Sequence, residues 1–164
     1  MDSRFRRLSL FDRVFLRLER PDLPEHVAGL CVLEAAPLLD AGGQLDLERI
    51  KRRLERRLIQ VPELRQVVRN TPPLCGPPLW VDDPGFSIAH HVHAVPVHPP
   101  GDQAGFLGTA ELLLRPLLDR SRPLWELWFV TGLQGGRLGL VFKIHHSIAD
   151  GLAAVALAGS LLDL

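Results

Sequence analysis

One uninterrupted run constrains the topology of this chain most strongly: Leu138-Gly139-Leu140-Val141-Phe142-Lys143-Ile144-His145-His146-Ser147-Ile148-Ala149-Asp150-Gly151. Its first seven residues are almost all apolar, as in a strand. A Gln-Gly-Gly-Arg turn at 134–137 precedes them, and a second apolar run over 123–130 precedes that turn. A glycine pair between two apolar runs is typical of a β-hairpin. The sequence therefore predicts two adjacent strands, over 123–130 and 138–144.

Outward from this hairpin, helical and extended patterns alternate. Ser9 and Asp12 have the spacing of a capping box, which predicts a short amphipathic helix ending near Leu18. The proline-rich segment 71–78 is predicted to be loop with short extended pieces, because proline supplies no backbone donor. The other predicted elements are a buried strand over 26–33, a helix over 46–60, a strand over 90–97, a helix over 103–114 and an apolar helix over 152–164. This alternation predicts an α/β (α+β) fold in which helices flank a mixed sheet.

Length, charge and cysteine content narrow the class of protein. The 164 residues suit one domain, and 19 basic against 19 acidic residues provide no overall field for nucleic acid. The longest uncharged apolar stretch, 152–162, is shorter than the ~20 residues that a membrane-spanning helix needs. Charges near the N-terminus interrupt any signal peptide, and Cys31 and Cys75 lack metal-ligand spacing. We expect a cytoplasmic protein with two free thiols.

Residues 145–151 are the strongest candidate for chemistry. They combine two imidazoles, an acid and a glycine directly after a predicted strand. If strand alternation continues to the end of this strand, His145 and His146 point in opposite directions. One imidazole then faces a cleft while the other is held inside the fold. This arrangement suits a single imidazole base better than a paired ligand site.

The same seven residues match the HHxxxDG motif of the CoA-dependent acyltransferase superfamily, which includes condensation domains and chloramphenicol acetyltransferase. Three further segments, 9–19, 24–27 and 118–126, resemble the start, the first strand and the Pro-Leu-Trp segment of bacterial wax ester synthase/diacylglycerol acyltransferases. Likeness of this kind runs along nearly the whole chain. The motif alone is shared by several activities, but together with the Pro-Leu-Trp segment in this order it points to that family.

The resemblance implies transfer of a fatty acyl group from acyl-CoA to the hydroxyl of a diacylglycerol or a long-chain alcohol. His146 is then the general base and His145 a supporting residue. Asp150 pairs with an arginine and holds the loop in shape, and Gly151 lets the backbone turn. The substrate-binding candidates are Pro123, Leu124 and Trp125. Acyl-CoA is a substrate, and neither a cofactor nor a metal is implied.

The resemblance also implies a partner, because members of this family look like two related halves. Residues 1–164 match the first half as a single N-terminal subdomain, so a C-terminal half or a second subunit is expected. A truncated reading frame, a processed fragment and one polypeptide of a split enzyme all remain open. The competing hypothesis is a non-catalytic fragment or partner that binds lipid or a second half without turnover.

One histidine-rich segment suggests a metal site. His90, His91, His93 and His98 suggest a metal, but alternation puts His91 and His93 on one strand face and His90 on the other, and no cysteine or acid completes a tetrahedral set. We interpret them as polar positions of a strand near the surface.

The helix over 46–60 carries excess positive charge. The default interpretation of this charge is a solvated helix face, and the alternative is peripheral contact with a membrane or lipid inclusion. The helix over 152–164 is apolar nearly all round, so we expect the isolated chain to self-associate or to bind lipid.

Overall fold

The computed structural model of the chain describes residues 5–72, 74–149 and 159. Its strands form two sheets. The larger is a four-stranded mixed sheet in the order β2-β7-β6-β5, in which only β5 and β6 run parallel. The smaller is an antiparallel sheet in the order β1-β4-β3. The strands are β1 (Phe5–Arg7), β2 (His26–Glu34), β3 (Gln66–Arg69), β4 (Leu79–Asp82), β5 (Val92–Pro96), β6 (Trp125–Leu133) and β7 (Arg137–His145).

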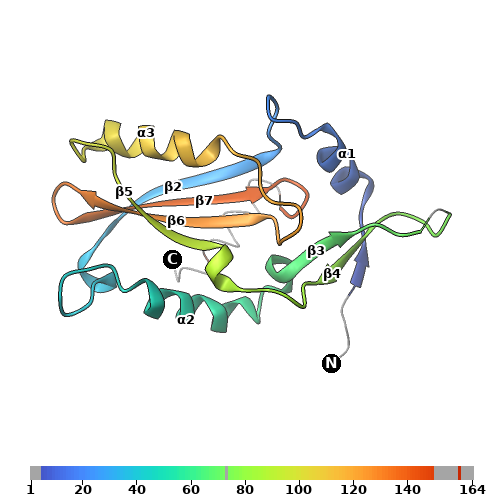
Figure 1. Cartoon of the computed structure of the whole chain (residues 1–164), viewed down its shortest axis with the longest axis horizontal. Helices are drawn as coiled ribbons and strands as arrows, with labels where there is room; N and C mark the ends of the chain where they lie inside the picture. Colours follow the sequence, from blue (N-terminus) through green and yellow to red (C-terminus); the bar gives the residue numbers. More distant parts are fainter. Residues whose placement is uncertain (1–4, 73, 150–158, 160–164) are drawn as a thin grey trace.

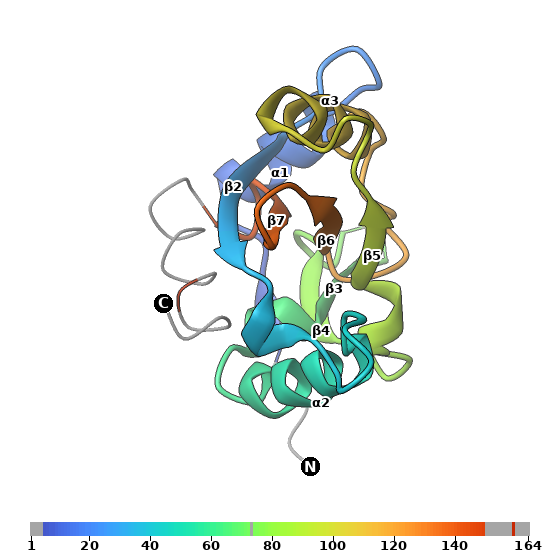
Figure 2. The same cartoon turned by 90° about the vertical axis from the view of Figure 1, so that its left-hand side faces the viewer.

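Three α-helices accompany these sheets: α1 (Leu10–Leu18), α2 (Leu47–Leu58) and α3 (Gln103–Leu114). Short 3-10 turns η1 (Ala36–Leu38), η2 (Pro62–Arg65) and η3 (Ile88–His90) connect the larger elements. In Figure 1, α2 and α3 lie on opposite sides of the four-stranded sheet, and α1 lies at the end of the molecule where β7 finishes. Figure 2 shows the same layering from the side. The fold class predicted from the sequence is therefore confirmed.

Each face of the four-stranded sheet has its own core. On the α2 face, Ile50, Leu54 and Leu58 pack against Phe142 and Ile144, together with the alternate residues of β6 and β7. On the α3 face, Phe106 and Ala110 pack against Val130 and Val141. The alternate residues of 138–144 thus belong to two separate clusters. Trp125 belongs to the first cluster and Trp128 packs against the second, since an odd separation along a strand puts two residues on opposite faces.

Glycine permits two features of the central hairpin. Gly135 and Gly136 have φ angles of 75° and 70°, in the region that glycine adopts without steric cost, and they make the tight turn between β6 and β7. At Gly139, a Cβ atom would lie 2.4 Å from the ring of Phe106. The missing side chain therefore lets α3 approach β7 closely.

The structure corrects three sequence predictions. The strand over 26–33 is at the edge of the sheet rather than buried, and its Leu30 and Val32 are 43% and 44% exposed. An apolar composition predicts a strand but not its neighbours, and α3 packs over β6 and β7 instead. The second sheet was not predicted, because its strands have three or four residues and pair with partners far away in the sequence.

The third correction concerns the histidines near β5. His91 stacks on Trp125, whereas His93 stacks on Trp128, so the two rings lie on opposite sides of the sheet. His91 caps η3 with a ψ angle of −24°, and strand alternation begins only at Val92. His91 is also 2% exposed, which contradicts the surface position expected for it.

Some predictions fall outside the described residues. Asp150, Gly151 and the helix expected over 152–164 belong to this group, apart from Gly159. Within the described part of the chain, no helix has the length and hydrophobicity required to cross a membrane.

Candidate active site

The two adjacent histidines of the motif stand where β7 ends. The backbone N–H of His145 donates to the carbonyl of Leu124 at 3.0 Å, and that of His146 donates to the carbonyl of Glu25 at 2.9 Å. Leu124 precedes β6, and Glu25 precedes β2. The two neighbours of β7 in the sheet therefore fix the backbone of both histidines.

His145 is fully buried, and its tautomer follows from its contacts. Nδ1 lies 3.0 Å from the backbone nitrogen and 2.7 Å from the hydroxyl of Ser147. Because a backbone N–H only donates, Nδ1 must accept, and the neutral ring carries its proton on Nε2. Burial lowers the pKa of His145 to about 4, although the nearby carboxylate of Glu19 acts in the opposite direction. His145 is therefore a neutral, fixed imidazole near pH 7.

Glu19 is the group that faces this proton. Its Oε1 lies 3.4 Å from Nε2 of His145, and its side chain is 1% exposed. Arg120 binds the other oxygen, Oε2, through Nε at 3.1 Å and Nη2 at 2.9 Å. Arg120 also donates to the carbonyl of Leu16 at 2.5 Å. A paired guanidinium offsets the cost of burying this carboxylate.

His146 has a different environment. It is half-buried, and its ring stacks on Phe15 of α1 with centroids 5.0 Å apart and planes inclined by 20°. The burial of His145 matches the prediction that one imidazole is held inside the fold, while the cleft predicted for the other stays a prediction. β7 ends at His145, so strand alternation does not extend to His146. Both rings lie next to α1: the ring of His146 stacks on Phe15, and the ring of His145 faces Glu19, the C-cap of the helix.

Helix α1 is held at both ends by buried carboxylates. At its start, Ser9 and Asp12 form the predicted capping box, and Trp80 donates from Nε1 to Asp12 at 3.1 Å. Burial alone would raise the pKa of Asp12, but the hydrogen bonds from Ser9 and Trp80 outweigh it and lower the pKa. At its end, Glu19 is held by Arg120. These anchors fix the helix whose Phe15 supports His146.

The Pro-Leu-Trp segment contributes through its backbone and through packing. Pro123 and Leu124 are buried, and Leu124 lines a cavity of about 530 Å³ between α1, β3 and the loop before β4. Trp125 lies in the core of the α2 face, where its Nε1 donates to the carbonyl of Leu64 at 2.7 Å. The structure therefore brings Leu124, one of the three substrate-binding candidates, to a cavity.

The cavity beside α1 has a mixed lining. Its apolar residues include Leu8, Leu10, Val14 and Leu16, and Arg13, Arg17 and Arg120 add three guanidinium groups. At about 100° per residue, its helix positions lie on the opposite side of α1 from Phe15. The cavity and His146 therefore flank the same helix on two sides.

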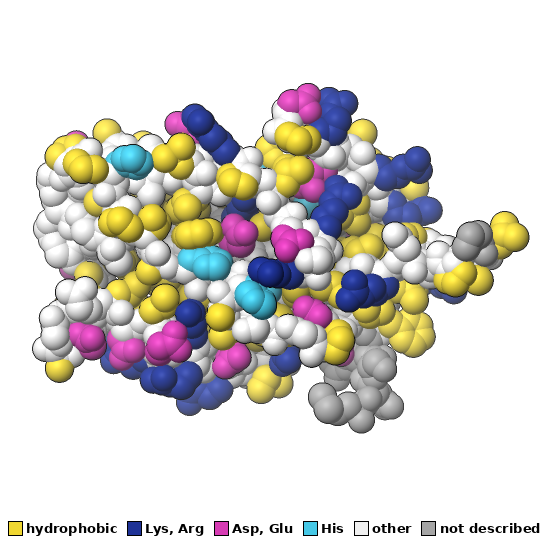
Figure 3. Space-filling model, viewed as in Figure 1, with side chains coloured by type: hydrophobic (Ala, Val, Ile, Leu, Met, Phe, Trp, Pro, Cys, Tyr) yellow, Lys and Arg dark blue, Asp and Glu magenta, His cyan; other side chains and the backbone are white. Residues whose placement is uncertain are grey.

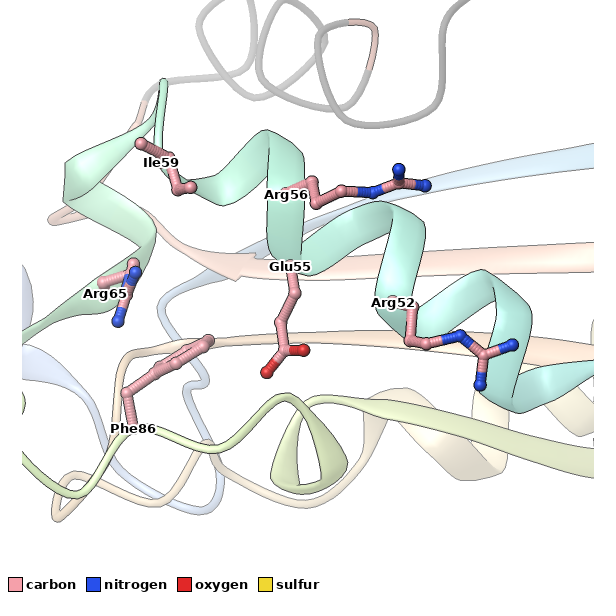
Figure 4. A pocket seen from close by; sticks show the side chains of 6 residues that line it. All are labelled: Arg52, Glu55, Arg56, Ile59, Arg65 and Phe86. Carbon is pink, nitrogen blue, oxygen red and sulfur yellow. The ribbon is translucent and has the colours of Figure 1, made fainter.

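A second hollow of about 620 Å³ lies between α2, η2 and the loop before η3. It is lined by Arg52, Glu55, Arg56, Ile59, Arg65 and Phe86. Figure 4 shows Glu55 pointing into the space beside Phe86, while the guanidinium groups of Arg52 and Arg56 point away from that ring. Arg65 is 5.0 Å from the ring centroid of Phe86. The guanidinium groups that line this hollow do not converge on one point, so the hollow is not a preformed anion site.

The remaining histidines and the two cysteines lie outside the motif. Within residues 5–72, 74–149 and 159, no group of three or more His, Cys, Asp or Glu side chains is arranged to hold a metal ion. His91 instead lies stacked between Phe86 and Trp125, and burial lowers its pKa to about 4. Cys31 and Cys75 are free thiols, as predicted.

The sequence identified the histidine pair but missed the residues that position it. Glu19, Arg120 and Ser147 contact one another or His145, and no spacing rule connects residues about 100 positions apart. The one local signal was Ser147, which lies inside the motif itself.

Comparisons with known proteins identify the family of the chain. The family model for the wax ester synthase/diacylglycerol acyltransferase catalytic domain matches residues 8–164. The chain is 36% identical to the probable diacylglycerol O-acyltransferase tgs3 of Mycobacterium tuberculosis over 158 residues, which are 96% of this chain and 56% of that protein. It is 34% identical to the putative diacylglycerol O-acyltransferase Rv1760 of the same species, covering 96% of this chain and 31% of that protein.

Solved structures give the same result. The wax ester synthase/diacylglycerol acyltransferase from Marinobacter aquaeolei VT8 aligns with a TM-score of 0.72 at 27% identity, over 93% of this chain and 37% of that one. The starter condensation domain of rhizomide synthetase RzmA aligns with a TM-score of 0.70 at 14% identity and shares the fold. The chain thus spans between about a third and just over half the length of these relatives. It belongs to the wax ester synthase/diacylglycerol acyltransferase catalytic-domain family.

Proposed function

We propose that this chain carries the base-bearing part of an O-acyltransferase, which moves a fatty acyl group from acyl-CoA to the hydroxyl of a diacylglycerol or a long-chain alcohol. Family membership supports the reaction class. The observation that carries the proposal is the contrast between two adjacent imidazoles. His145 is buried with Nδ1 occupied, whereas His146 is half-buried and its ring stacks on Phe15.

In the proposed reaction, His146 takes the proton of the acceptor hydroxyl as the alcohol oxygen attacks the thioester carbonyl. The new C–O bond forms, the C–S bond breaks, and the imidazolium returns its proton to the departing CoA thiolate. The products are an ester and free CoA. Imidazole is the side chain most often used as a general base near neutral pH. Transfer is direct, without an acyl-enzyme.

The neighbouring residues have supporting roles in this proposal. His145, fixed by Ser147 and Glu19, holds the end of β7 so that His146 keeps its direction. Asp150 holds the following loop in shape, and Gly151 permits its turn. Leu124 contributes to binding of the apolar part of a substrate, since it lines the cavity beside α1.

The relatives are longer than this chain, and we propose that the complete reaction also uses the part they carry beyond the match. That part belongs either to the same polypeptide or to a partner subunit, and residues 1–164 form the N-terminal subdomain. Peripheral contact with a membrane or a lipid inclusion brings the lipid substrates to the site.

The test is an acyl-transfer assay with palmitoyl-CoA as donor and either dioleoylglycerol or hexadecanol as acceptor, in detergent. Release of the CoA thiol and formation of the ester are measured together. The chain is assayed alone and co-expressed with the remaining part of the relative tgs3. Ester formation with either acceptor in at least one preparation supports the proposal. Absence of ester in both preparations, although the chain is folded, contradicts it and favours non-catalytic lipid binding.

A further inference from the structure

Helix α1 presents its apolar side chains to the outside and its acids to the inside. Leu10, Phe11, Val14 and Leu18 are 64%, 73%, 40% and 51% exposed, whereas Asp12 and Glu19 are buried. At about 100° per residue, these four apolar positions span about 100° of one helix face. A surface helix of a globular protein normally has the reverse arrangement. The four residues are called the α1 stripe below.

The inward face of the helix explains how this arrangement is held. Asp12 and Glu19 are seven residues apart, so they lie on the same side two turns apart. Trp80 binds the first and Arg120 the second. These polar contacts fix the orientation of α1. Because the two acids are held on the inner side of the helix, the α1 stripe faces outward.

The charges around the α1 stripe are positive. Arg13 and Arg17 lie beside it on the helix, and Arg20 follows at 64% side-chain exposure. Of the acids in this segment, Asp12 and Glu19 are turned inward, and Asp22 is paired with Arg20 at 3.2 Å. Figure 3 shows basic and hydrophobic side chains gathered at the end of the molecule that carries α1. An apolar stripe flanked by arginines complements an anionic lipid surface, in which apolar side chains enter the acyl region and guanidinium groups contact phosphates.

The cavity beside α1 gives a second observation. Leu10 and Val14 belong to the α1 stripe and also line the cavity of about 530 Å³. Arg13 and Arg17 line it as well. The exposed apolar surface therefore continues into a partly open cavity lined by apolar and basic side chains, which a lipid chain can enter.

The basic helix α2 lacks this combination. Its apolar residues Ile50, Leu54 and Leu58 are buried in the core, so its outward face is charged without an apolar stripe. Charge alone attracts a protein to a membrane surface but gives no insertion. The lipid contact considered from the sequence for 46–60 is therefore better assigned to α1.

We propose that the α1 stripe docks on an anionic lipid surface, with Phe11 and Leu18 inserted and Arg13, Arg17 and Arg20 on the headgroups. The proposal refines the lipid contact named under the proposed function, but it does not depend on catalysis. It assigns a surface, an orientation and a lipid class to that contact.

The test is co-sedimentation of the full chain with vesicles of phosphatidylcholine, with and without phosphatidylglycerol, at low and high salt. We expect binding to the anionic vesicles that weakens as salt rises. The variant Phe11→Ser/Leu18→Ser removes two apolar side chains that do not line the cavity, and should weaken binding about tenfold or more. The matched control is Leu107→Ser/Leu112→Ser on α3, which removes two leucines of 49% and 47% exposure and should leave binding unchanged.

Three results would overturn the proposal. The first is equal vesicle binding by wild type and by Phe11→Ser/Leu18→Ser. The second is an equal loss in the α3 control, which would show general hydrophobic adhesion. The third is a wild-type chain that ignores vesicles and instead self-associates through Phe11 and Leu18, which would assign the α1 stripe to a second copy. Because vesicle binding needs no turnover, an inactive chain that binds as described contradicts the proposed function alone.

Discussion

Nε2 of His145 and Oε1 of Glu19 face each other 3.4 Å apart in the interior of the protein, with side-chain exposures of 0% and 1%. Glu19 caps α1, and His145 ends β7. This contact therefore joins the helix that supports His146 to the strand that carries it. Arg120 extends the link to the loop before β6, so three elements meet at one carboxylate.

Replacing this carboxylate should destabilise the fold. In Glu19→Gln, the amide keeps the shape but loses the charge that Arg120 and the Nε2 proton of His145 face. We expect the free energy of unfolding to fall by about 1–3 kcal/mol, the usual cost of weakening a buried hydrogen-bonded group. Urea denaturation followed by circular dichroism measures this change.

The matched control for that variant is Asp22→Asn. Its carboxylate also pairs with an arginine, at 3.2 Å, but both side chains are well exposed. Exposed pairs contribute little, so its free energy of unfolding should change by less than about 0.5 kcal/mol. Equal effects of the two variants would show that Glu19 has no special place in the structure.

Stability should decrease as pH falls below neutrality. Burial lowers the pKa of both His91 and His145 to about 4, from an ordinary value of 6.5. Between about pH 6.5 and about 4 the unfolded chain binds protons on these residues that the folded chain does not. Each histidine then lowers the free energy of unfolding as the pH falls through that window, and has no further effect below it.

His91→Gln isolates one of these contributions. It removes a titrating ring, so the slope of unfolding free energy against pH should become shallower between pH values of about 4 and 6.5. His98→Gln, at an exposed position, is the matched control for the substitution itself. The free energy of unfolding is measured by urea denaturation across this pH range. Identical slopes for wild type and His91→Gln would show that His91 does not contribute to the pH dependence of stability.

Gly139→Ala should destabilise the contact between α3 and the sheet. The added Cβ would lie 2.4 Å from the ring of Phe106, so the ring or the helix must shift. We expect a loss of about 1–3 kcal/mol, as for overpacking in other cores. In the background Phe106→Leu, which makes room, the same glycine substitution should cost less; additive losses in a double-mutant cycle would show that the two residues are not coupled.

The sequence predicted those features that local patterns control. The capping box of Ser9 and Asp12, the turn at Gly135 and Gly136, and the burial contrast between His145 and His146 are all present in the structure. Each depends on residues close together in the chain. The motif itself is of this kind, and the family resemblance that it carries implied His146 as the base.

Features set by distant partners could not be predicted in this way. The periodicity of α1 revealed an apolar stripe but not that two buried carboxylates turn it outward. The edge position of β2 and the second sheet likewise depend on pairings between distant segments. Glu19 was missed for the same reason, because Arg120 and His145 reach it only after folding.

The most direct test of the account is the rate of acyl transfer by His146→Ala, measured in the preparation that forms ester. Loss of a general base should reduce the rate about 10²–10⁴-fold. Thermal unfolding should stay nearly unchanged, because the ring is half-exposed. His145→Ala should instead lower stability as well as rate, since that ring is fully buried. A His146→Ala protein that turns over at nearly the wild-type rate would contradict the account and remove His146 from the mechanism.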